Sequence, residues 1–380
     1  MRSRLLALAA AAALIVPVFA CGRGRTTDEI VIGEYGSLTG GIATFGISTK
    51  NGSTMAFDEV NNAGGVLGKK IRLLVEDDQS KPEEAGTVVT KLINQNHVVA
   101  VLGQVASSHS LAAAPICQAN HVPMVSPSST NPRVTQTGDY IFRVCFIDPF
   151  QGAVMAKFAA NTLKAKKVAI LVDVRSDYSV GLQTFFRDQF KQLGGEIVSE
   201  QSYSQGDSDF RAQLTRIKAI NPDAIYVPGY YTEVGTIARQ ARELGIAASV
   251  PLLGGDGWDS PKLWEIGGAA LNGCYLSNHY SVDDPSPLVQ KFVSDYKTRF
   301  NVVPDALAAL GYDAAKIMAD AMTRAGSSEG PKVRDALAAT KDFPGVTGKI
   351  TINAERNAVK PAVVLKVENG KFVYVETVTP

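Results

Sequence analysis

Short apolar runs alternate with amphipathic stretches from residue 30 onward. The strand-like runs of the first half are residues 30–33, 70–76, 98–102 and 122–125. The helix-like stretches between them are residues 45–62, 82–95 and 107–120. This order predicts a parallel sheet covered by helices on both faces, because each parallel strand must be joined to the next by a crossover.

The same alternation starts again after residue 150. The predicted helices are residues 151–163, 180–193 and 232–244, and the predicted strands are residues 167–172, 197–203, 224–227 and 250–253. A further helix is expected to be capped by Asp209, with Phe210, Leu214 and Ile217 on one face. A chain of 380 residues is too long for one ordinary core, so we expect two open α/β domains.

The end of the chain has a different order of elements. A strand-like stretch at residues 274–278 is followed by three predicted helices, at residues 287–300, 305–325 and 331–339. Residues 362–367 and 372–378 flank Asn369-Gly370, which predicts a β-hairpin. Helices followed by one hairpin do not make a third domain, so we expect returning chain that completes both domains.

The N-terminus has the pattern of an export signal. Arg2 and Arg4 precede an apolar stretch at residues 5–18, which is too short to span a membrane. It ends at Ala20-Cys21, which resembles the cleavage site of bacterial lipoproteins. We therefore expect a signal peptide over residues 1–20, lipidation of Cys21 and a polar tether over residues 21–28. The alternative is ordinary cleavage near Ala20 that leaves a free cysteine.

The charge and the residue composition argue against some classes of function. The net charge is +1 with both signs interspersed, which argues against nucleic-acid binding. The four histidines do not have the spacing of a metal site. We expect neither a metal nor a cofactor. Cys117 is expected to be buried, and whether it pairs with Cys145 or Cys274 is open from sequence.

Two familiar catalytic or phosphate-binding patterns are not matched. The glycine-rich residues 64–70 lead from a helix to a strand, the reverse of a phosphate-binding loop, and are better explained as a helix stop and a tight turn. The chain has no G-x-S-x-G motif, so Ser107 or Ser108 as the nucleophile of a hydrolase has little support.

Small hydroxyl residues follow two neighbouring predicted strands. Ser107 and Ser108 come after residues 98–102, and the sequence SPSSTNP at residues 126–132 comes after residues 122–125. Turn chemistry alone is one explanation. The other is a polar ligand, since ligands of open α/β sheets lie at the carboxyl ends of the strands and a helix start favours an anion.

An ordered series of motifs resembles the substrate-binding proteins of ABC importers, of the branched-chain amino-acid (leucine/isoleucine/valine) type. The motifs are GSLTG (36–40), NNAGGV (61–66), DD (77–78), SS (107–108), SPSSTNP (126–132), FR (142–143), GYY (229–231) and GGDG (254–257). Each motif alone is weak, but their order and spacing extend over nearly all of the chain after the signal.

This resemblance implies the type I fold of periplasmic binding proteins. Two similar open parallel-sheet lobes are then joined by three hinge crossovers, near Asp148, His279 and Thr351, and the ligand lies between the lobes. Lobe 1 is expected to comprise residues 29–148 plus 280–351. Lobe 2 is expected to comprise residues 149–279 plus 352–380.

The resemblance also implies the ligand-binding residues. They are Phe45, Ser107, Ser108, Ser128, Thr130, Tyr178, Tyr230 and Asp256. Ser107 is expected to bind a ligand carboxylate, and Asp256 to neutralise an ammonium.

The other residues of this set are expected to form hydrogen bonds to the ligand or to form the walls of its pocket. The Ser128 carbonyl is expected to accept from the ammonium and the Thr130 hydroxyl to bridge both ligand groups. Tyr178 and Tyr230 are expected to close over the ligand, and Phe45 to wall its side chain. Core packing for Phe45, and turn roles for Ser128, Thr130 and Asp256, are the alternatives. Ser126 and Ser129 are taken as turn residues.

The implied function is non-enzymatic capture of a free amino acid, branched-chain or otherwise apolar, for delivery to a membrane permease. We expect a monomer that is exported and anchored by lipid to a membrane face, in the periplasm or at the cell surface. The same fold holding an amide, urea or an aromatic acid is the first alternative. An exported serine hydrolase is an alternative from another class.

Overall fold

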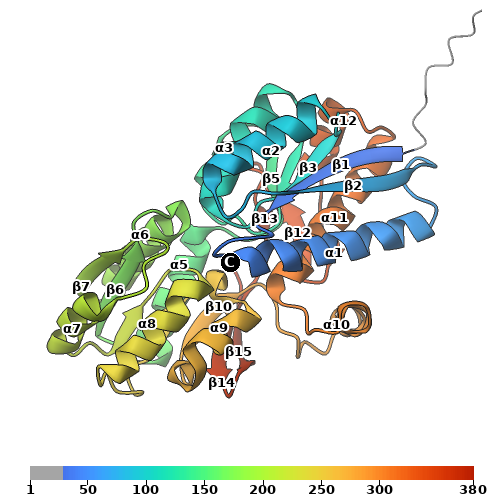
Figure 1. Cartoon of the computed structure of the whole chain (residues 1–380). Coiled ribbons are helices and arrows are strands. Elements are labelled where there is room, and N and C mark those ends of the chain that lie inside the picture. Colours follow the sequence, from blue (N-terminus) through green and yellow to red (C-terminus); the bar gives the residue numbers. More distant parts are fainter. Residues whose placement is uncertain (1–28) are drawn as a thin grey trace, which may run out of the picture.

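The computed structural model describes residues 29–380, so the predicted signal peptide, tether and Cys21 lie outside the described residues. Two α/β lobes lie side by side, and the chain passes between them three times (Figure 1). The first lobe carries the early, blue and cyan part of the chain, and the second carries the green and yellow part.

Lobe 1 is built on a five-stranded parallel sheet in the order β2-β1-β3-β4-β5. Its strands are β1 (Glu29–Gly36), β2 (Lys70–Asp77), β3 (Ala100–Leu102), β4 (Met124–Ser126) and β5 (Ile141–Arg143). Its first helices are α1 (Ala43–Asn62), α2 (Pro82–Asn94), α3 (Ser107–Ala119) and α4 (Arg133–Gln136). Strands β3, β4 and β5 are buried throughout, as expected where helices cover both sides of a parallel sheet, whereas the edge strand β2 is mostly half-buried.

Lobe 2 is built on a seven-stranded sheet in the order β15-β14-β10-β9-β8-β6-β7. The parallel strands are β6 (Lys167–Asp173), β7 (Glu196–Tyr203), β8 (Ala224–Tyr226), β9 (Leu252–Gly254) and β10 (Tyr275–Asn278). The helices are α5 (Asp148–Lys157), α6 (Asp177–Gln192), α7 (Arg211–Ile220), α8 (Tyr231–Glu243) and α9 (Pro261–Gly267). Shorter helical turns are Phe158–Thr162, Asp256–Trp258 and Gly268–Leu271.

The end of the chain contributes to both lobes. The late helices are α10 (Pro287–Phe300), α11 (Ala306–Ala325) and α12 (Gly330–Ala338), and α11 packs along α1 of lobe 1. The hairpin of β14 (Ala362–Glu368) and β15 (Lys371–Val378) instead extends the sheet of lobe 2 by pairing antiparallel with β10. A small sheet of β11 (Phe343–Gly345), β12 (Gly348–Ile352) and β13 (Ala358–Val359), which was not predicted, precedes this hairpin.

Three boundaries differ from the sequence prediction for identifiable reasons. Helix α6 begins at Asp177 rather than residue 180, because the Ser176 hydroxyl accepts from the Ser179 N–H and caps it there. Phe210, not Asp209, is the N-cap of α7, and the Asp209 carboxylate accepts from the Arg211 N–H instead. The helix predicted from residue 151 already starts at Asp148, with Pro149 in its first turn.

Two local expectations, the turn after α1 and the burial of Cys117, are confirmed. Gly64 and Gly65 have positive φ angles and lead into a tight turn closed by Val66 and Lys69, as a helix stop requires. Cys117, Cys145 and Cys274 are buried and free, which settles the pairing left open by the sequence.

Within residues 29–380 there is no cluster of ligands suited to a metal ion. None of the helices described is long and apolar enough to cross a bilayer.

Candidate functional site

A small cavity of ≈ 10 Å³ lies where the two lobes meet. Five of the eight residues predicted to bind ligand line it: Phe45, Ser128, Tyr178, Tyr230 and Asp256. Val105, Gly257 and Leu307 complete the lining. Ser107 and Thr130 are buried and Ser108 is half-buried, and all three are outside this lining, so the structure brings together part of the predicted set.

The two hydroxyl clusters are neighbours because their strands are paired. Leu102 of β3 lies opposite Val125 of β4, so the loops that follow both strands leave the same edge of the sheet. Ser107 begins α3, and its hydroxyl accepts from the Asn131 N–H at 3.2 Å across the two loops. The start of α3 therefore lies at the carboxyl edge of the lobe 1 sheet, where parallel sheets hold ligands.

Ser108 joins the two lobes with its side chain. Its hydroxyl donates to Asp177 Oδ2 at 2.9 Å and accepts from the Asp177 N–H at 3.0 Å, and Asp177 begins α6 of lobe 2. The Ser108 hydroxyl is thus engaged between the lobes. This contact could not be read from the sequence, because the two residues lie 69 positions apart.

Ser126 and Ser129 have the turn roles assigned to them. Ser126 and Ser129 donate to the Gln104 carbonyl at 2.7 and 2.8 Å, respectively. The Ser129 N–H in turn donates to the Ser126 hydroxyl at 2.8 Å. These hydroxyls hold the loops after β3 and β4 together.

Thr130 and Asp148 are two buried polar residues outside the lining of the cavity. Both are fully buried, and the Asp148 N–H donates to the Thr130 carbonyl at 3.0 Å. Among residues 29–380, neither the Thr130 hydroxyl nor either Asp148 carboxylate oxygen has a hydrogen-bond partner. Burial raises the pKa of Asp148 to about 8.

Asp256 is held by side chains from both lobes and from the second crossover. It begins the helical turn after β9 and is buried. Its Oδ1 accepts from Gln151 Nε2 at 2.8 Å and from the Tyr178 hydroxyl at 3.0 Å. Its Oδ2 lies 3.0 Å from His279 Nε2 and 3.4 Å from the Ser128 hydroxyl of lobe 1. These partners are remote in sequence, so Asp256 does not use its carboxylate as a local turn aspartate would.

His279 is uncharged at neutral pH. Burial lowers its pKa to about 4, and its ring stacks on Phe146 with ring centres 3.8 Å apart. Nε2 must then carry the proton that is donated to Asp256. All four donors around the Asp256 carboxylate are consequently neutral groups, and none of them cancels its charge.

Glycine beside Asp256 permits this close packing. A Cβ atom on Gly255 would lie 2.4 Å from the Tyr178 hydroxyl and 2.5 Å from Gln151 Oε1. Any side chain at position 255 would therefore displace the two groups that hold Asp256 Oδ1. Sequence reasoning named Asp256 and Tyr178 but missed Gln151 and His279, whose only signal was their position at the expected crossovers.

Aromatic rings form the apolar wall of the cavity. Tyr178 and Tyr230 are stacked, with centres 5.3 Å apart and planes 9° apart. Phe45 of α1 meets Tyr230 and Tyr231 edge to face, at 5.4 and 5.0 Å. Because Phe45 belongs to lobe 1 and the tyrosines to lobe 2, this cluster forms only when the lobes are closed. Tyr231 was not predicted.

Hydrogen bonds around the cavity also join the lobes. The Thr44 and Ser260 hydroxyls lie 2.9 Å apart, and the Thr232 hydroxyl donates to the Gly41 carbonyl at 2.6 Å. Arg133 of lobe 1 pairs with Asp177 of lobe 2 at 2.9 Å. The structure therefore has the closed arrangement of the two lobes.

The histidine next to the paired serines has a different set of contacts. His109 Nδ1 lies 3.0 Å from Asp78 Oδ2 and 3.4 Å from Gln104 Nε2, and Asp78 Oδ1 accepts from the Ser37 hydroxyl at 2.7 Å. The hydroxyls of Ser107 and Ser108 are instead bonded to Asn131 and Asp177. This arrangement gives no support to a serine nucleophile activated by His109.

Comparison with known proteins places the chain in a family. The periplasmic binding protein family matches residues 29–371. The Leu/Ile/Val-binding protein BraC3 of Rhizobium johnstonii is 32% identical over 351 residues, covering 92% of this chain and 94% of the relative.

Solved structures agree with this assignment. A leucine-binding protein from Thermotoga maritima is 43% identical, with a TM-score of 0.89 over 92% of this chain and 99% of the other. The branched-chain amino-acid transporter substrate-binding protein of Streptococcus pneumoniae, in complex with isoleucine, is 37% identical, with a TM-score of 0.88 over 93% and 100% of the two chains.

A third structure has a different kind of ligand. It is a solute-binding protein of an ABC transporter from Rhodopseudomonas palustris in complex with 3,4-dihydroxybenzoic acid. It is 27% identical, with a TM-score of 0.84 over 93% of this chain and 98% of the other. Fold, motif order and similarity over nearly all of the described residues agree, and the chain belongs to the periplasmic binding protein family, with relatives among the leucine/isoleucine/valine-binding proteins of ABC transporters.

Proposed function

We propose that this protein captures a free amino acid between its two lobes and delivers it to the permease of an ABC importer. The observation that carries the proposal is the buried Asp256 carboxylate, which has only neutral donors and lines the inter-lobe cavity. A buried charge needs a partner of opposite sign, and the ammonium of an amino acid supplies one.

The other end of the ligand would face lobe 1. The first turn of α3, beginning at Ser107, offers backbone N–H groups and the positive end of the helix dipole to a carboxylate. The free hydroxyl of Thr130 and the Ser128 residue at the cavity wall would complete the polar contacts. In this proposal Ser108 contributes through the helix start, while its hydroxyl stabilises lobe closure.

The apolar lining supports a hydrophobic ligand side chain. Phe45, Val105 and Leu307 line the cavity together with the stacked Tyr178 and Tyr230. Burial of apolar area against this wall favours a branched-chain or other apolar amino acid over a charged one.

Capture would require movement of the lobes. The cavity of ≈ 10 Å³ has room for about one water molecule, so an amino acid reaches the site only when the lobes separate or the lining rearranges. The three crossovers allow a hinge rotation, and a ligand that touches both lobes shifts the population toward the closed form.

An aromatic acid or other ligand without an ammonium is the second candidate. It is favoured by one observation: Asp256 already has four hydrogen-bond donors in the closed structure, so its lone pairs are satisfied without a ligand. A ligand that carries only a carboxylate would then use the start of α3 and leave Asp256 as a structural residue.

The proposal also covers where the protein is located, how it is attached to a membrane and whether it acts as a monomer. We infer export, acylation at Cys21, attachment to a membrane face and a monomeric, non-catalytic binding role. The lobes that close on each other here do not need a second subunit to complete the cavity.

A ligand screen by thermal shift tests the function directly. The twenty amino acids, together with amides, urea and aromatic acids, would be added at millimolar concentration, since a bound ligand raises the melting temperature by mass action. A rise confined to apolar amino acids supports the proposal. A rise confined to aromatic acids, amides or urea replaces it with the second candidate.

A further inference from the structure

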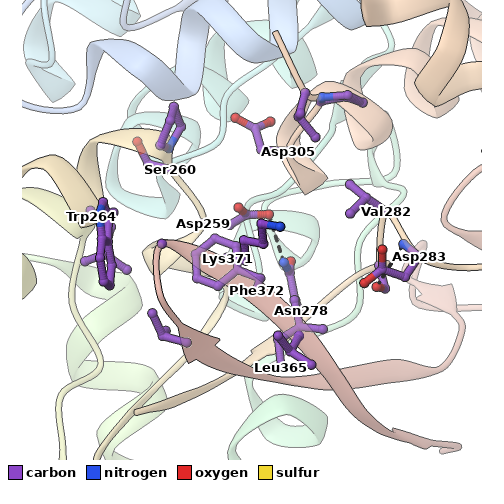
Figure 2. A pocket seen from close by; sticks show the side chains of 18 of the residues that line it. Asp259, Ser260, Trp264, Asn278, Val282, Asp283, Asp305, Leu365, Lys371 and Phe372 are labelled. Carbon is purple, nitrogen blue, oxygen red and sulfur yellow. Dashed lines mark hydrogen bonds between the residues drawn. The ribbon is translucent and has the colours of Figure 1, made fainter. Parts of the chain in front are cut away.

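A second, larger cavity lies between the lobes beside the second crossover. It has a volume of ≈ 530 Å³ and shares no lining residue with the small cavity around Asp256. We call it the crossover cavity. Trp264, Leu365 and Phe372 line it from lobe 2, Val282 from the crossover, and Pro304 and Asp305 from the loop before α11 (Figure 2).

The walls of the crossover cavity are mainly apolar. The indole of Trp264 and the ring of Phe372 are only partly buried, and both side chains border the cavity, as Figure 2 shows. Leu365 also lines the cavity and is buried. A volume of this size, with aromatic walls and a few polar groups, is typical of pockets that hold small organic molecules.

Two carboxylates, one from each lobe, meet at the N-terminus of α11. Asp259 Oδ2 accepts from Asn278 Nδ2 and from the Ala306 N–H, both at 2.8 Å. Asp305 caps the same helix, since its Oδ1 accepts from the Ala308 N–H at 2.9 Å, and its Oδ2 accepts from the Ser48 hydroxyl at 2.5 Å. All of these donors are neutral, so neither negative charge is cancelled by them.

The proximity of the two acids has an electrostatic cost. Burial, followed by the charge of Asp259, raises the pKa of Asp305 to about 7, and burial also raises the pKa of Asp259. Lys297 and Lys371, which also line the cavity, are exposed, so water screens their charges. A cation placed between Asp259 and Asp305 would remove the repulsion that the closed lobes impose.

We propose that the crossover cavity binds an organic ammonium compound, with the ammonium between Asp259 and Asp305 and an apolar or aromatic body against Trp264 and Phe372. The apolar body gains from burial against the aromatic walls, and the ammonium gains from two carboxylates. Because the acids come from opposite lobes, such a ligand binds the closed form better and favours closure.

Calorimetric titration at pH 8 with 2-phenylethylamine tests this site, with 2-phenylethanol as the neutral analogue. The amine is expected to bind to one site and the alcohol at least about tenfold more weakly. Asp305→Asn, which keeps the helix cap, and Trp264→Leu should each weaken amine binding about tenfold or more. Asp295→Asn, an exposed acid on α10, is the matched control and should leave binding within about twofold.

Three results would overturn the proposal: no amine binding at millimolar concentration, equal binding of the amine and the alcohol, or unchanged binding by a folded Asp305→Asn. The Asp256→Asn variant separates the two cavities. Amine binding that persists in this variant supports the crossover cavity, whereas binding that disappears assigns the probe to the smaller cavity. Circular dichroism and melting temperature confirm that each variant is folded.

Discussion

His279 Nε2 lies 3.0 Å from Asp256 Oδ2, so a residue of the second crossover holds the carboxylate that lines the small cavity. Gln151, which follows the first crossover, holds the other oxygen of the same carboxylate at 2.8 Å. The position of Asp256 is therefore tied to the segments about which the lobes rotate. Closure and the placement of the negative charge are expected to be coupled.

Removal of the His279 donor should weaken ligand binding, although His279 does not line the small cavity. His279→Leu is expected to lower affinity about tenfold, because a hydrogen bond to a charged group is lost and Asp256 is left free to move. His279→Gln keeps a donor at nearly the same place and should stay within about threefold of the parent. Calorimetric titration of both variants checks this. Equal losses in both would show that His279 acts through packing on Phe146 instead.

Asp148 should make stability depend on pH. Its folded-state pKa of about 8 is above the unfolded value of about 3.9, so between these values the folded protein holds a proton that the unfolded chain has lost. The free energy of unfolding should then fall as pH rises from about 4 to 8, by up to about 1.4 kcal/mol per pH unit from this group.

Asp148→Asn removes this titration and should flatten the pH dependence of unfolding in urea. The difference between variant and parent is the informative quantity, since other buried acids titrate in both. Asp188→Asn, an exposed acid of α6, is the control and should keep the slope of the parent. A parent-like slope in Asp148→Asn would mean that Asp148 is ionised in the folded protein.

The contact between Ser108 and Asp177 should stabilise the closed form. Asp177→Ala also breaks the ion pair with Arg133, and we expect affinity to fall about two- to fivefold as the open form becomes more populated. Small-angle scattering should show a larger radius of gyration for the unliganded variant and recovery at saturating ligand. Asp188→Ala on the same helix is the control. Equal radii of gyration for the two variants would show that the contact between Ser108 and Asp177 does not stabilise the closed form.

Cys21 should be the first residue of the mature chain and carry acyl groups. The reason is the short apolar stretch that ends at Ala20-Cys21. Intact-mass spectrometry of the membrane fraction is expected to show the added lipid, and Cys21→Ser should move the protein to the soluble fraction. An unmodified Cys21 in soluble protein would contradict lipidation.

Local signals predicted much of the fold. Ser286 caps α10, Pro287 starts it and Asn301 ends it in the left-handed conformation, so both ends were readable from a few residues. The small sheet of β11, β12 and β13 was missed because strands of two to five residues carry almost no periodic pattern.

Only part of the site could be predicted from the sequence. The order of the motifs identifies the ends of the strands, but it does not show which side chains from the two lobes meet there. Ser128, Tyr230 and Asp256 lie in motifs that follow strands, whereas Tyr178 was implied by the family resemblance alone. Gln151, His279 and the contact between Ser108 and Asp177 depend on how the lobes close, which brings together residues 69 to 105 positions apart or on different crossovers. No local pattern encodes that relationship.

Titration of leucine into the parent and into Asp256→Asn tests whether a zwitterionic amino acid is bound with its ammonium at Asp256. Asparagine keeps the shape and removes the charge, and loss of one partner of a desolvated charge pair costs about 2–5 kcal/mol. We expect one site in the parent and a loss of about 30-fold to several thousand-fold in the variant. Leucine affinity within about threefold of the parent, or no binding of any apolar amino acid to the parent, would contradict it.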